Sequence, residues 1–280
     1  MKTLLTLPLL LLSLVSFHSW SETFDDLVER EGIYYKKFSD VPFTGEVEGR
    51  VQGKVKNGKQ EGAWFFFDTS GQLNQKGNYQ NGKREGIWLA YYGSGRLLSS
   101  EGYKNGSLES RVYYHENGQV FYKVDYKNGK EEGPWVTYWE NGKLSHKGDY
   151  KNGEREGPWV HYHENGQLER KGNYYNGKRE GPWVEYHDNG QLKRKGNYYN
   201  GKRKGPWVHY HENGQLWMKG KYDGFQQQGF WISYSDNGQL LSKGDYKDGK
   251  RVGRWFFYDQ FGNLNNERSG VYKDGKKISD

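Results

Sequence analysis

One glycine-rich segment of the chain has the spacing of a phosphate-binding loop. Gly172, Gly177 and Lys178 match the Gly-x-x-x-x-Gly-Lys part of that motif, in which backbone amides hold a nucleotide phosphate. The next residue is Arg179, where the motif needs a hydroxyl group for the metal ion, and a Gly-Pro-Trp sequence follows in place of a helix. We therefore interpret the segment as a hairpin turn. The same pattern recurs at Gly77, Gly196 and Gly244.

Histidines form a second regular set, each preceding an acidic residue and an Asn-Gly pair. Imidazoles from stacked units can share a metal ion. However, Trp139 and Ser235 occupy the same position in other units, and no carboxylate or thiolate at a fixed spacing completes a ligand shell. We expect polar side chains beside turns and no metal site. The set comprises His115, His163, His187 and His211, and His161 and His209 lie two residues upstream of two of its members.

Acidic residues are plentiful, but they recur at equivalent positions such as Glu164, Asp188 and Glu212. Acid–base catalysis needs a carboxylate whose surroundings differ from those of its neighbours, and a repeated environment does not provide one. The chain contains no cysteine and no Gly-x-Ser-x-Gly motif for a serine nucleophile. We therefore expect a protein without enzymatic activity and without a cofactor.

The composition argues against an ordinary globular core. Only 33% of the 280 residues are apolar, yet the chain has 11 Trp, 24 Tyr, 13 Phe and 40 Gly. This is too little aliphatic material for a deep core and too many aromatic residues for a disordered chain. The formal net charge is +7, and basic and acidic residues are interleaved, which favours a soluble surface. A thin sheet held together by rows of aromatic side chains fits these observations.

The first 21 residues have the layout of a secretory signal peptide. Lys2 precedes an apolar run from Leu4 to Val15, and small residues precede Glu22. The run is too short to span a bilayer; a buried N-terminal helix is the alternative. We expect a soluble bacterial protein that is exported to the periplasm or the extracellular space. Because cysteine is absent, neither a lipid anchor nor a disulfide is expected, and the rest of the fold must supply the stability.

A block of about 24 residues recurs through most of the chain. One copy begins at Gly157 with Gly-Pro-Trp-Val, and such a period is typical of repeat proteins, whose units bury apolar surface against their neighbours. Asn165-Gly166 and Asn176-Gly177 are dipeptides that favour two-residue type I′ turns, and the segments between them are typical of strands. The sequence predicts an all-β fold, an elongated single-layer antiparallel meander of tandem β-hairpins.

A two-residue turn at Asn165-Gly166 also predicts which residues face each other. Trp159 then faces Gly172, where a large ring would cover exposed backbone. In one unit Arg111 replaces tryptophan and faces Val124, so the ring and the glycine are lost together, as expected of a cross-strand pair. The same rule gives the pairs Trp64–Gly77, Trp135–Gly148, Trp183–Gly196, Trp207–Gly220 and Trp231–Gly244.

Two units break this rule. Trp88 faces Glu101 and Trp255 faces Arg268, so either a bulge intervenes or the ring pairs with a glycine slightly further along the strand. The sequence also leaves two alternatives for which side chains share a face of the sheet. Strict alternation places Trp159 and Leu168 on one face and Val160 and Tyr162 on the other, so either both faces carry aromatic residues or bulges intervene.

The chain divides into four parts on this pattern. We expect a signal peptide over residues 1–21, an N-terminal segment and cap over 22–58, nine tandem repeats over 59–270 and a C-terminal end over 271–280. The anchor positions of the nine repeats are Trp64, Trp88, Arg111, Trp135, Trp159, Trp183, Trp207, Trp231 and Trp255.

The pattern Gly-x-Trp-x-x-Tyr, Asn-Gly-x-Leu and Lys-Gly-x-Tyr-x-Asn-Gly resembles MORN repeats, in the bacterial variant form of proteins labelled YwqK-family antitoxins. The opening segments 30–35 and 42–45 are similar to those proteins too. The resemblance covers roughly residues 30 to 275. It implies an elongated single-layer sheet without catalysis, which neutralises a partner toxin by direct binding. The signal peptide departs from a cytosolic antitoxin and favours an exported immunity or envelope protein.

The aromatic columns are the candidate binding surface, because exposed rings stack on sugars and on partner side chains. The alternative is that the same rings form the ladder that holds a sheet without a core. The candidate binding or ladder residues are Trp64, Trp135, Trp159, Trp183, Trp207, Trp231, Tyr138, Tyr162, Tyr186 and Tyr210.

Two functional hypotheses follow from these residues. The first is an exported scaffold or immunity protein that binds another protein, such as a toxin, along its ribbon face. The second is an envelope-binding module that recognises glycan or anionic lipid through aromatic and basic columns. No nucleic-acid partner is expected, because no recognised nucleic-acid-binding module is present. The basic residues at issue are Arg170, Lys171, Arg194 and Lys195.

Overall fold

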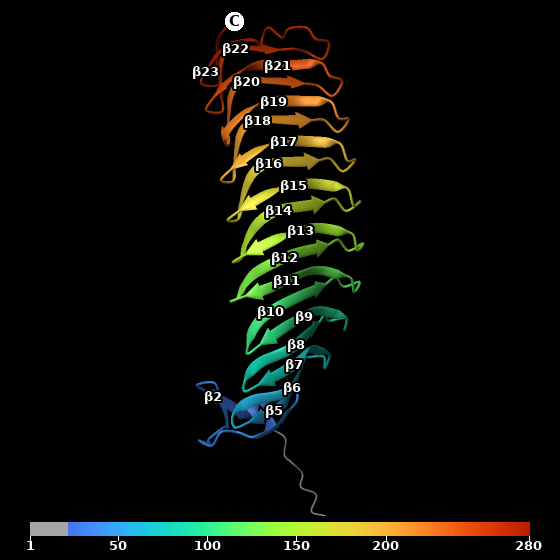
Figure 1. The fold of residues 1–280 in the computed structure, drawn as a ribbon, viewed down its shortest axis with the longest axis vertical. Helices are drawn as coiled ribbons and strands as arrows, with labels where there is room; N and C mark the ends of the chain where they lie inside the picture. Colours follow the sequence, from blue (N-terminus) through green and yellow to red (C-terminus); the bar gives the residue numbers. More distant parts are fainter. Residues whose placement is uncertain (1–21) are drawn as a thin grey trace, which may run out of the picture.

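The computed structural model describes residues 22–280, which form one long ribbon of stacked β-hairpins (Figure 1). The expected signal peptide lies outside the described residues. Within them, the predicted all-β meander of tandem hairpins is confirmed: a single 22-stranded sheet accounts for the ribbon, beside one 3-10 turn, Phe24–Asp26. None of the helices in this part of the chain is long and apolar enough to cross a membrane.

The strands follow one another in space almost as they do in the sequence. The N-terminal segment contains β1 (Glu22–Thr23), β2 (Leu27–Arg30), β3 (Ile33–Lys36), β4 (Gly45–Glu48) and β5 (Val51–Lys56). The first repeats contain β6 (Lys59–Phe67), β7 (Leu73–Gln80), β8 (Lys83–Tyr91), β9 (Leu97–Lys104), β10 (Ser107–Tyr114), β11 (Val120–Lys127), β12 (Lys130–Tyr138) and β13 (Leu144–Lys151). The later ones contain β14 (Glu154–Tyr162), β15 (Leu168–Tyr175), β16 (Lys178–Tyr186), β17 (Leu192–Tyr199), β18 (Lys202–Tyr210), β19 (Leu216–Gly224), β20 (Gln226–Tyr234), β21 (Leu240–Lys247), β22 (Lys250–Phe257), β23 (Gly270–Lys273) and β24 (Lys276–Ser279).

Each strand from β4 to β24 pairs antiparallel with the next, as β14 with β15 and β15 with β16. At the N-terminus β1 pairs parallel with β4, and β2 and β3 form a separate hairpin. Further aromatic side chains pack against the first and last indoles of the ribbon. Phe24 packs edge-on against Trp64, and Phe257 stacks on Trp255.

The turn at Asn176-Gly177 has the predicted geometry. Both residues have positive φ, 47° and 72°, and Tyr175 pairs directly with Lys178. These are the features of a type I′ turn, which asparagine and glycine accept with little strain. The sequence that resembles a phosphate-binding loop is therefore a strand followed by this hairpin turn.

The turn at Asn165-Gly166 differs from the prediction. Within this loop Gly166 alone has positive φ, 92°, and the amide of His163 donates to the carbonyl of Gln167 at 2.8 Å. Three residues therefore form the loop, which is the arrangement of a type I turn followed by a left-handed glycine. Glu169 is then an extra residue in β15, because Tyr162 pairs with Leu168 and His161 pairs with Arg170.

This bulge restores the register that a two-residue turn would give. Trp159 pairs with Gly172 as predicted. The other predicted pairs are also observed, including Arg111 with Val124 and Trp88 with Glu101. Trp255 is the exception, since its partner is Gly270 and not Arg268. The loop between β22 and β23 is longer than the other loops, so the residue that pairs with Trp255 lies further along the chain than predicted.

The rings, however, do not lie over the glycines that they face. A Cβ atom on Gly172 would overlap the indole of Trp183, which belongs to the next unit. Between β15 and β16, Gly181 to Trp183 face only Gly172, because Lys171 pairs with Val184 and Asn173 with Glu180. The expected contact within each hairpin is therefore wrong, and the ring joins consecutive units. The observed pairs are Gly53–Trp64, Gly77–Trp88, Gly148–Trp159, Gly172–Trp183, Gly196–Trp207, Gly220–Trp231 and Gly244–Trp255.

Two junctions between units depart from this ladder. Arg111 stands in a tryptophan position and its Nε donates to Glu101 Oε1 at 2.7 Å, so an ion pair replaces the ring and the glycine. At the next junction Val124 is fully buried where other units have glycine. Trp135 cannot cover it and stacks on Tyr122 instead, with ring centroids 5.1 Å apart.

Tyrosine rings complete the ladder by filling the spaces between the indoles. Tyr174 packs edge-to-face against Trp159 and Trp183, at centroid distances of 5.8 and 5.2 Å. The guanidinium group of Arg179 lies 4.6 Å from the Trp183 ring, and the indole Nε1 donates to the carbonyl of Asn173 at 3.2 Å. These contacts bury the aromatic rings in a sheet that has no second layer.

The bulges settle which side chains share a face. Tyr162 and Leu168 are direct cross-strand partners and lie on the side opposite Trp159, because side chains alternate along a strand. The expectation that Leu168 shares a face with Trp159 is therefore wrong, since the extra residue Glu169 reverses the alternation. We call the side with the indoles the ladder face and the side with Val160, Tyr162 and Leu168 the open face. Both faces carry aromatic residues, and bulges also intervene.

The contact between Gly172 and Trp183 predicts a local sensitivity to one methyl group. Gly172→Ala adds a Cβ atom that the indole must avoid, and such overpacking typically costs about 1–3 kcal/mol. Gly93→Ala is the matched control, because no atom lies within 4 Å of a Cβ built there. Urea unfolding of both variants should show a lower midpoint for Gly172→Ala alone; equal midpoints would contradict the ladder.

The ladder and the hairpin loops should differ in their contribution to stability. Trp183→Ala removes a buried ring and should cost about 3–5 kcal/mol. His187→Ala removes a hydrogen bond from the ring Nε2 to the Tyr210 carbonyl, 3.1 Å long, which is worth about 1 kcal/mol. Thermal and urea denaturation of the two variants measure this ranking, and equal losses would refute it.

Candidate functional site

A column of hydrogen-bond donors runs along the ladder face beside the three-residue loops. The ring Nε2 of His163 bonds the carbonyl of Tyr186 in the next unit at 3.1 Å. In other units Trp139 donates to the Tyr162 carbonyl at 3.2 Å. Tyr92 makes the equivalent bond with its hydroxyl group, which donates to the Tyr114 carbonyl at 2.7 Å. The shared feature is an aromatic side chain with a hydrogen-bond donor, which explains why tryptophan interrupts the histidines. Equivalent bonds are made by His115, His187 and His211.

Asparagine side chains join the same loops. Asn165 Nδ2 donates to the carbonyl of Asp188 in the next unit at 2.6 Å, and its Oδ1 accepts from the amide of Gln167 at 2.8 Å. The histidines and asparagines of the repeat thus connect backbone to backbone from one unit to the next. Equivalent bonds are made by Asn117, Asn141, Asn189 and Asn213.

Between this column and the indoles lies a band of cross-strand pairs that changes from unit to unit. The first member of each pair lies two residues after a ladder tryptophan, and the second faces it in the next strand. The backbone pairing at this position is the same in these units. One pair consists of Glu185 and Arg194, whose carboxylate and guanidinium groups are 2.7 Å apart. The band comprises Thr137–His146, His161–Arg170, Glu185–Arg194, His209–Met218 and Ser233–Ser242.

Two histidines of this band are buried as neutral rings. His161 is 1% exposed and His209 is 5% exposed, and the Nε2 atom of each lacks a hydrogen-bond partner within the described chain. Burial first, and then the charge of Arg170, lower the pKa of His161 from 6.5 to about 2. Burial and then Arg194 lower the pKa of His209 to about 4. The sequence placed these two histidines two residues upstream of loop histidines, but it did not indicate that they are buried.

The bulge residue of each hairpin stands next to the band, and most of these residues are exposed or half-buried, whereas Ser145 is buried. We call this set the bulge row. Its chemistry differs in almost every unit: amide, aliphatic, aromatic, hydroxyl, acidic and basic side chains all occur. Phe121 is 41% exposed and Trp217 is 43% exposed. The bulge row comprises Asn74, Leu98, Phe121, Ser145, Glu169, Lys193, Trp217 and Leu241.

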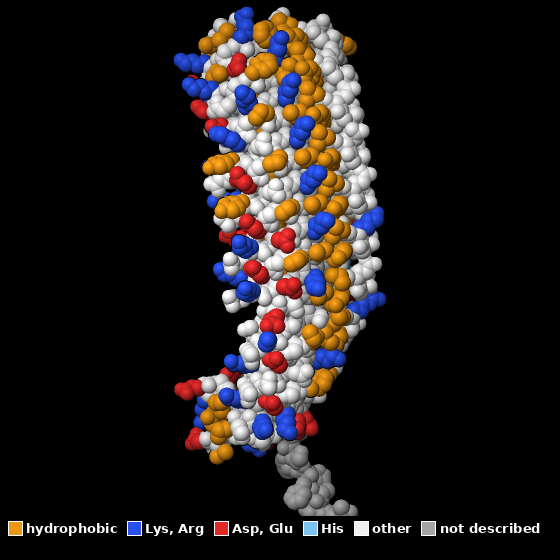
Figure 2. Space-filling model, in the orientation of Figure 1, with side chains coloured by type: hydrophobic (Ala, Val, Ile, Leu, Met, Phe, Trp, Pro, Cys, Tyr) orange, Lys and Arg blue, Asp and Glu red, His pale blue; other side chains and the backbone are white. Residues whose placement is uncertain are grey.

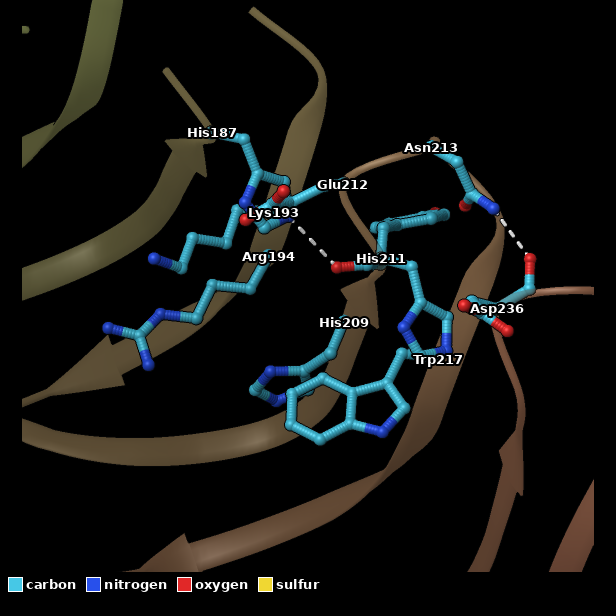
Figure 3. A pocket seen from close by; sticks show the side chains of 10 residues that line it. His187, Lys193, Arg194, His209, His211, Glu212, Asn213, Trp217 and Asp236 are labelled. Atoms are coloured by element: carbon cyan, nitrogen blue, oxygen red, sulfur yellow. Dashed lines mark hydrogen bonds between the residues drawn. The ribbon is translucent and has the colours of Figure 1, made fainter. Parts of the chain in front are cut away.

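Trp217 forms one wall of a hollow of about 630 Å³ on the ladder face (Figure 3). Its ring lies 6.0 Å from that of His209 and 5.8 Å from that of His211. Lys193 and Arg194 line the opposite side. Sequence reasoning counted tryptophans only at the ladder position and missed this one. The available signal was an aromatic residue at a position that is polar in the three preceding units, as Ser145, Glu169 and Lys193.

The residues predicted as binding or ladder residues fall into two groups. Trp64, Trp159, Trp183, Trp207 and Trp231 are at most 3% exposed and lie within the ladder, whereas Trp135 is half-buried. The tyrosines are half-buried on the open face. Among residues 22–280, no three or more histidines or acidic side chains gather in a cluster that could hold a metal. The tyrosines are Tyr138, Tyr162, Tyr186 and Tyr210.

The buried histidines predict a loss of stability in mild acid. Their pKa values in the folded chain lie below 6.5, so the unfolded chain binds protons first as the pH falls below that value. Stability should be constant above pH 7 and then decrease by up to about 1.4 kcal/mol per histidine and pH unit. Urea titrations from pH 8 to pH 5 measure this slope. His161→Gln combined with His209→Gln should reduce it; an unchanged slope would contradict the assignment.

Comparison with known proteins identifies the repeat. The MORN repeat variant family matches residues 60–81, 110–128, 131–152, 155–176, 179–200, 203–223 and 227–248, which together exceed half of the chain. No curated protein matches the sequence.

Solved structures match with low overall similarity. One is a GtfA/B complex bound to UDP and GlcNAc, 13% identical, with a TM-score of 0.15 over 49% of this chain and 25% of that one. A second is TcdB2-TccC3-Cdc42, 14% identical, with a TM-score of 0.16 over 77% of this chain and 14% of that one. A third is choline binding protein F from Streptococcus pneumoniae, 15% identical, with a TM-score of 0.16 over 89% of this chain and 97% of that one. At these TM-scores no functional conclusion follows. The family model matches seven successive segments of the chain, and these segments follow the period of the hairpins. Together with the observed hairpins, the matches show that this chain belongs to the MORN repeat variant family.

Proposed function

We propose that this chain is a non-enzymatic binding protein that holds another protein against its ladder face. The observation that carries the proposal is the bulge row. Its residues sit at one structural position, yet Asn74, Glu169, Lys193 and Trp217 have four different chemistries. The fold does not require these differences, because the backbone pairing is the same in each unit. They are free to distinguish a partner.

The same observation favours a protein over a uniform polymer. A glycan or a lipid surface presents the same groups to each unit, so a row that recognised it would repeat the same residue. A folded protein presents different groups along its length, as the bulge row does. The exposed rings of Phe121 and Trp217 are suitable anchors, since aromatic side chains often dominate the energetics of protein interfaces.

The absence of catalysis is part of the proposal. The titratable side chains nearest to the bulge row are buried, as with His161, engaged in ion pairs, as with Glu185 and Arg194, or bonded to a backbone carbonyl, as with His211. Neutralisation of a toxin is one form that such binding would take. With a cleaved signal peptide, the partner would be met in the periplasm or outside the cell.

The test is capture of a partner by matched variants. Phe121→Ser combined with Trp217→Ser should weaken a stoichiometric protein complex at least about tenfold, the effect of about 1.4 kcal/mol. The control combines Phe65→Ser with Phe230→Ser, which removes two exposed phenylalanines outside the bulge row. Periplasmic and secreted extracts supply the partner, and calorimetry gives the affinities. Equal loss in both variants would contradict the proposal, as would retention on peptidoglycan or anionic vesicles without any protein partner.

A toxin partner has an additional signature. If the captured protein inhibits growth when it is produced alone, co-production of this chain should restore growth. The variant with Phe121→Ser and Trp217→Ser should fail to restore it, while the control variant succeeds. If the captured protein has no effect on growth, the chain does not neutralise a toxin, and a scaffold role is the remaining form of the proposal.

A further inference from the structure

The open face carries a regular row of lysines set between apolar side chains. Lys171 pairs with Val160 in the preceding strand and with Val184 in the following one. The same arrangement continues from Val112 and Lys123 to Lys243 and Phe256. Figure 2 shows the result as a continuous hydrophobic stripe along the ribbon, with basic groups spaced evenly beside it. We call this set the lysine row.

The charge of the lysine row is not neutralised by neighbouring side chains. Lys147, Lys171 and Lys195 are exposed, and none of the ion pairs found within residues 22–280 involves them. Their aliphatic stems lie beside valines, so each site combines an apolar floor with a positive charge. A long apolar stripe on a surface is typical of an interaction site. The lysines beside this stripe favour a ligand that carries negative charge.

The spacing of the lysine row matches one type of extended chain. Its lysines occur on alternate strands, so their separation along the ribbon is about 9.6 Å, twice the strand spacing. A polyproline II helix has three residues per turn and rises about 3.1 Å per residue, or about 9.3 Å per turn. An acidic residue at every third position of such a helix would therefore meet one lysine per unit.

A second row supplies the surface that polyproline helices prefer. Tyr138 pairs with Leu144, and Tyr162 pairs with Leu168, on the same face as the lysines. Proline-rich segments dock in grooves lined by aromatic rings, where their preformed helix loses little entropy. The tyrosines and the lysine row run side by side along the open face, so one extended segment could contact both rows.

One hollow breaks the regularity of the open face. Val120 occupies the position that leucine fills in the following units, such as Leu144. The shorter side chain contributes to a depression of about 720 Å³, lined also by Val112, Tyr138 and Gln119. A periodic ligand can otherwise shift by one unit at no cost, so this hollow is suited to define its register.

We propose that the open face binds an acidic, proline-rich segment of a partner protein as a polyproline II helix. Its carboxylates pair with the lysine row, its prolines lie against the tyrosines, and one apolar side chain enters the hollow at Val120. This site is on the side of the sheet opposite the bulge row. It is therefore independent of the function proposed for the ladder face, and variants on one face should not affect the other.

The test measures binding of a labelled peptide to the full chain by fluorescence anisotropy. The probe is six repeats of Pro-Pro-Glu, compared with Pro-Pro-Gln repeats and with a peptide of the same composition whose glutamates are clustered. Only the regularly spaced acidic peptide should bind well. Charge reversal of Lys147, Lys171 and Lys195 to Glu should weaken binding at least about tenfold. Equal binding of the three peptides would overturn the proposal.

The matched control reverses three exposed lysines at the two-residue turns, Lys151, Lys178 and Lys202, and should change the affinity less than about twofold. Circular dichroism of both triple variants checks that the sheet is intact. Equal loss in both would show unspecific attraction. Binding of polygalacturonate or phosphatidylglycerol vesicles through the lysine row, without binding of the acidic peptide, would also overturn the proposal.

The hollow is tested with a residue that the repeat already tolerates. Val120→Leu restores the side chain of the following units and should fold normally. It should weaken a peptide that carries one leucine in place of a central proline about fivefold, and leave the plain Pro-Pro-Glu peptide unchanged. An unchanged affinity for both peptides would overturn the role of the hollow.

Discussion

The indole that lies over a glycine of the preceding unit is the contact on which the ribbon depends. A single-layer sheet has no second layer in which to bury side chains, so its apolar surface must be covered from within the same face. The contact of Trp183 with Gly172 does this, because the absence of a side chain on one strand leaves room for the largest side chain of the next. The tyrosines then fill the gaps between indoles. Each hairpin is stable only beside its neighbours, as in other repeat proteins.

The two irregular junctions divide this ladder. Buried rings form one cluster around Trp64 and Trp88 and another from Trp159 to Trp207. Between them, Arg111 with Glu101 and the buried Val124 replace the indole–glycine contact. A half-buried ion pair contributes less than a buried ring. The backbone pairing is continuous through this region, so the sheet is unbroken while its side-chain packing is not.

Because the repeat is regular, the residues that hold the fold together are distinct from the residues that are available to bind a partner. Positions that make the ladder and the loop hydrogen bonds are nearly constant, and they leave the bulge row and the lysine row free. On the ladder face the free positions differ from unit to unit, which suits a partner with a non-repeating surface. On the open face they repeat, which suits a ligand with a matching period. Two kinds of binding are thus compatible with one sheet.

The sequence by itself determined the hairpin repeat, the strand pairing and the cross-strand register, because these depend on local turn chemistry and on side-chain period. It correctly paired Trp159 with Gly172, although its two-residue turn at Asn165-Gly166 was wrong and a bulge compensated for the error. Only the tertiary structure decided that each ring covers a glycine of the neighbouring unit. The packing of one hairpin on the next depends on bulges and strand bending, which single-strand patterns do not encode. For the same reason the burial of His161 and the exposure of Trp217 emerged only from the folded chain.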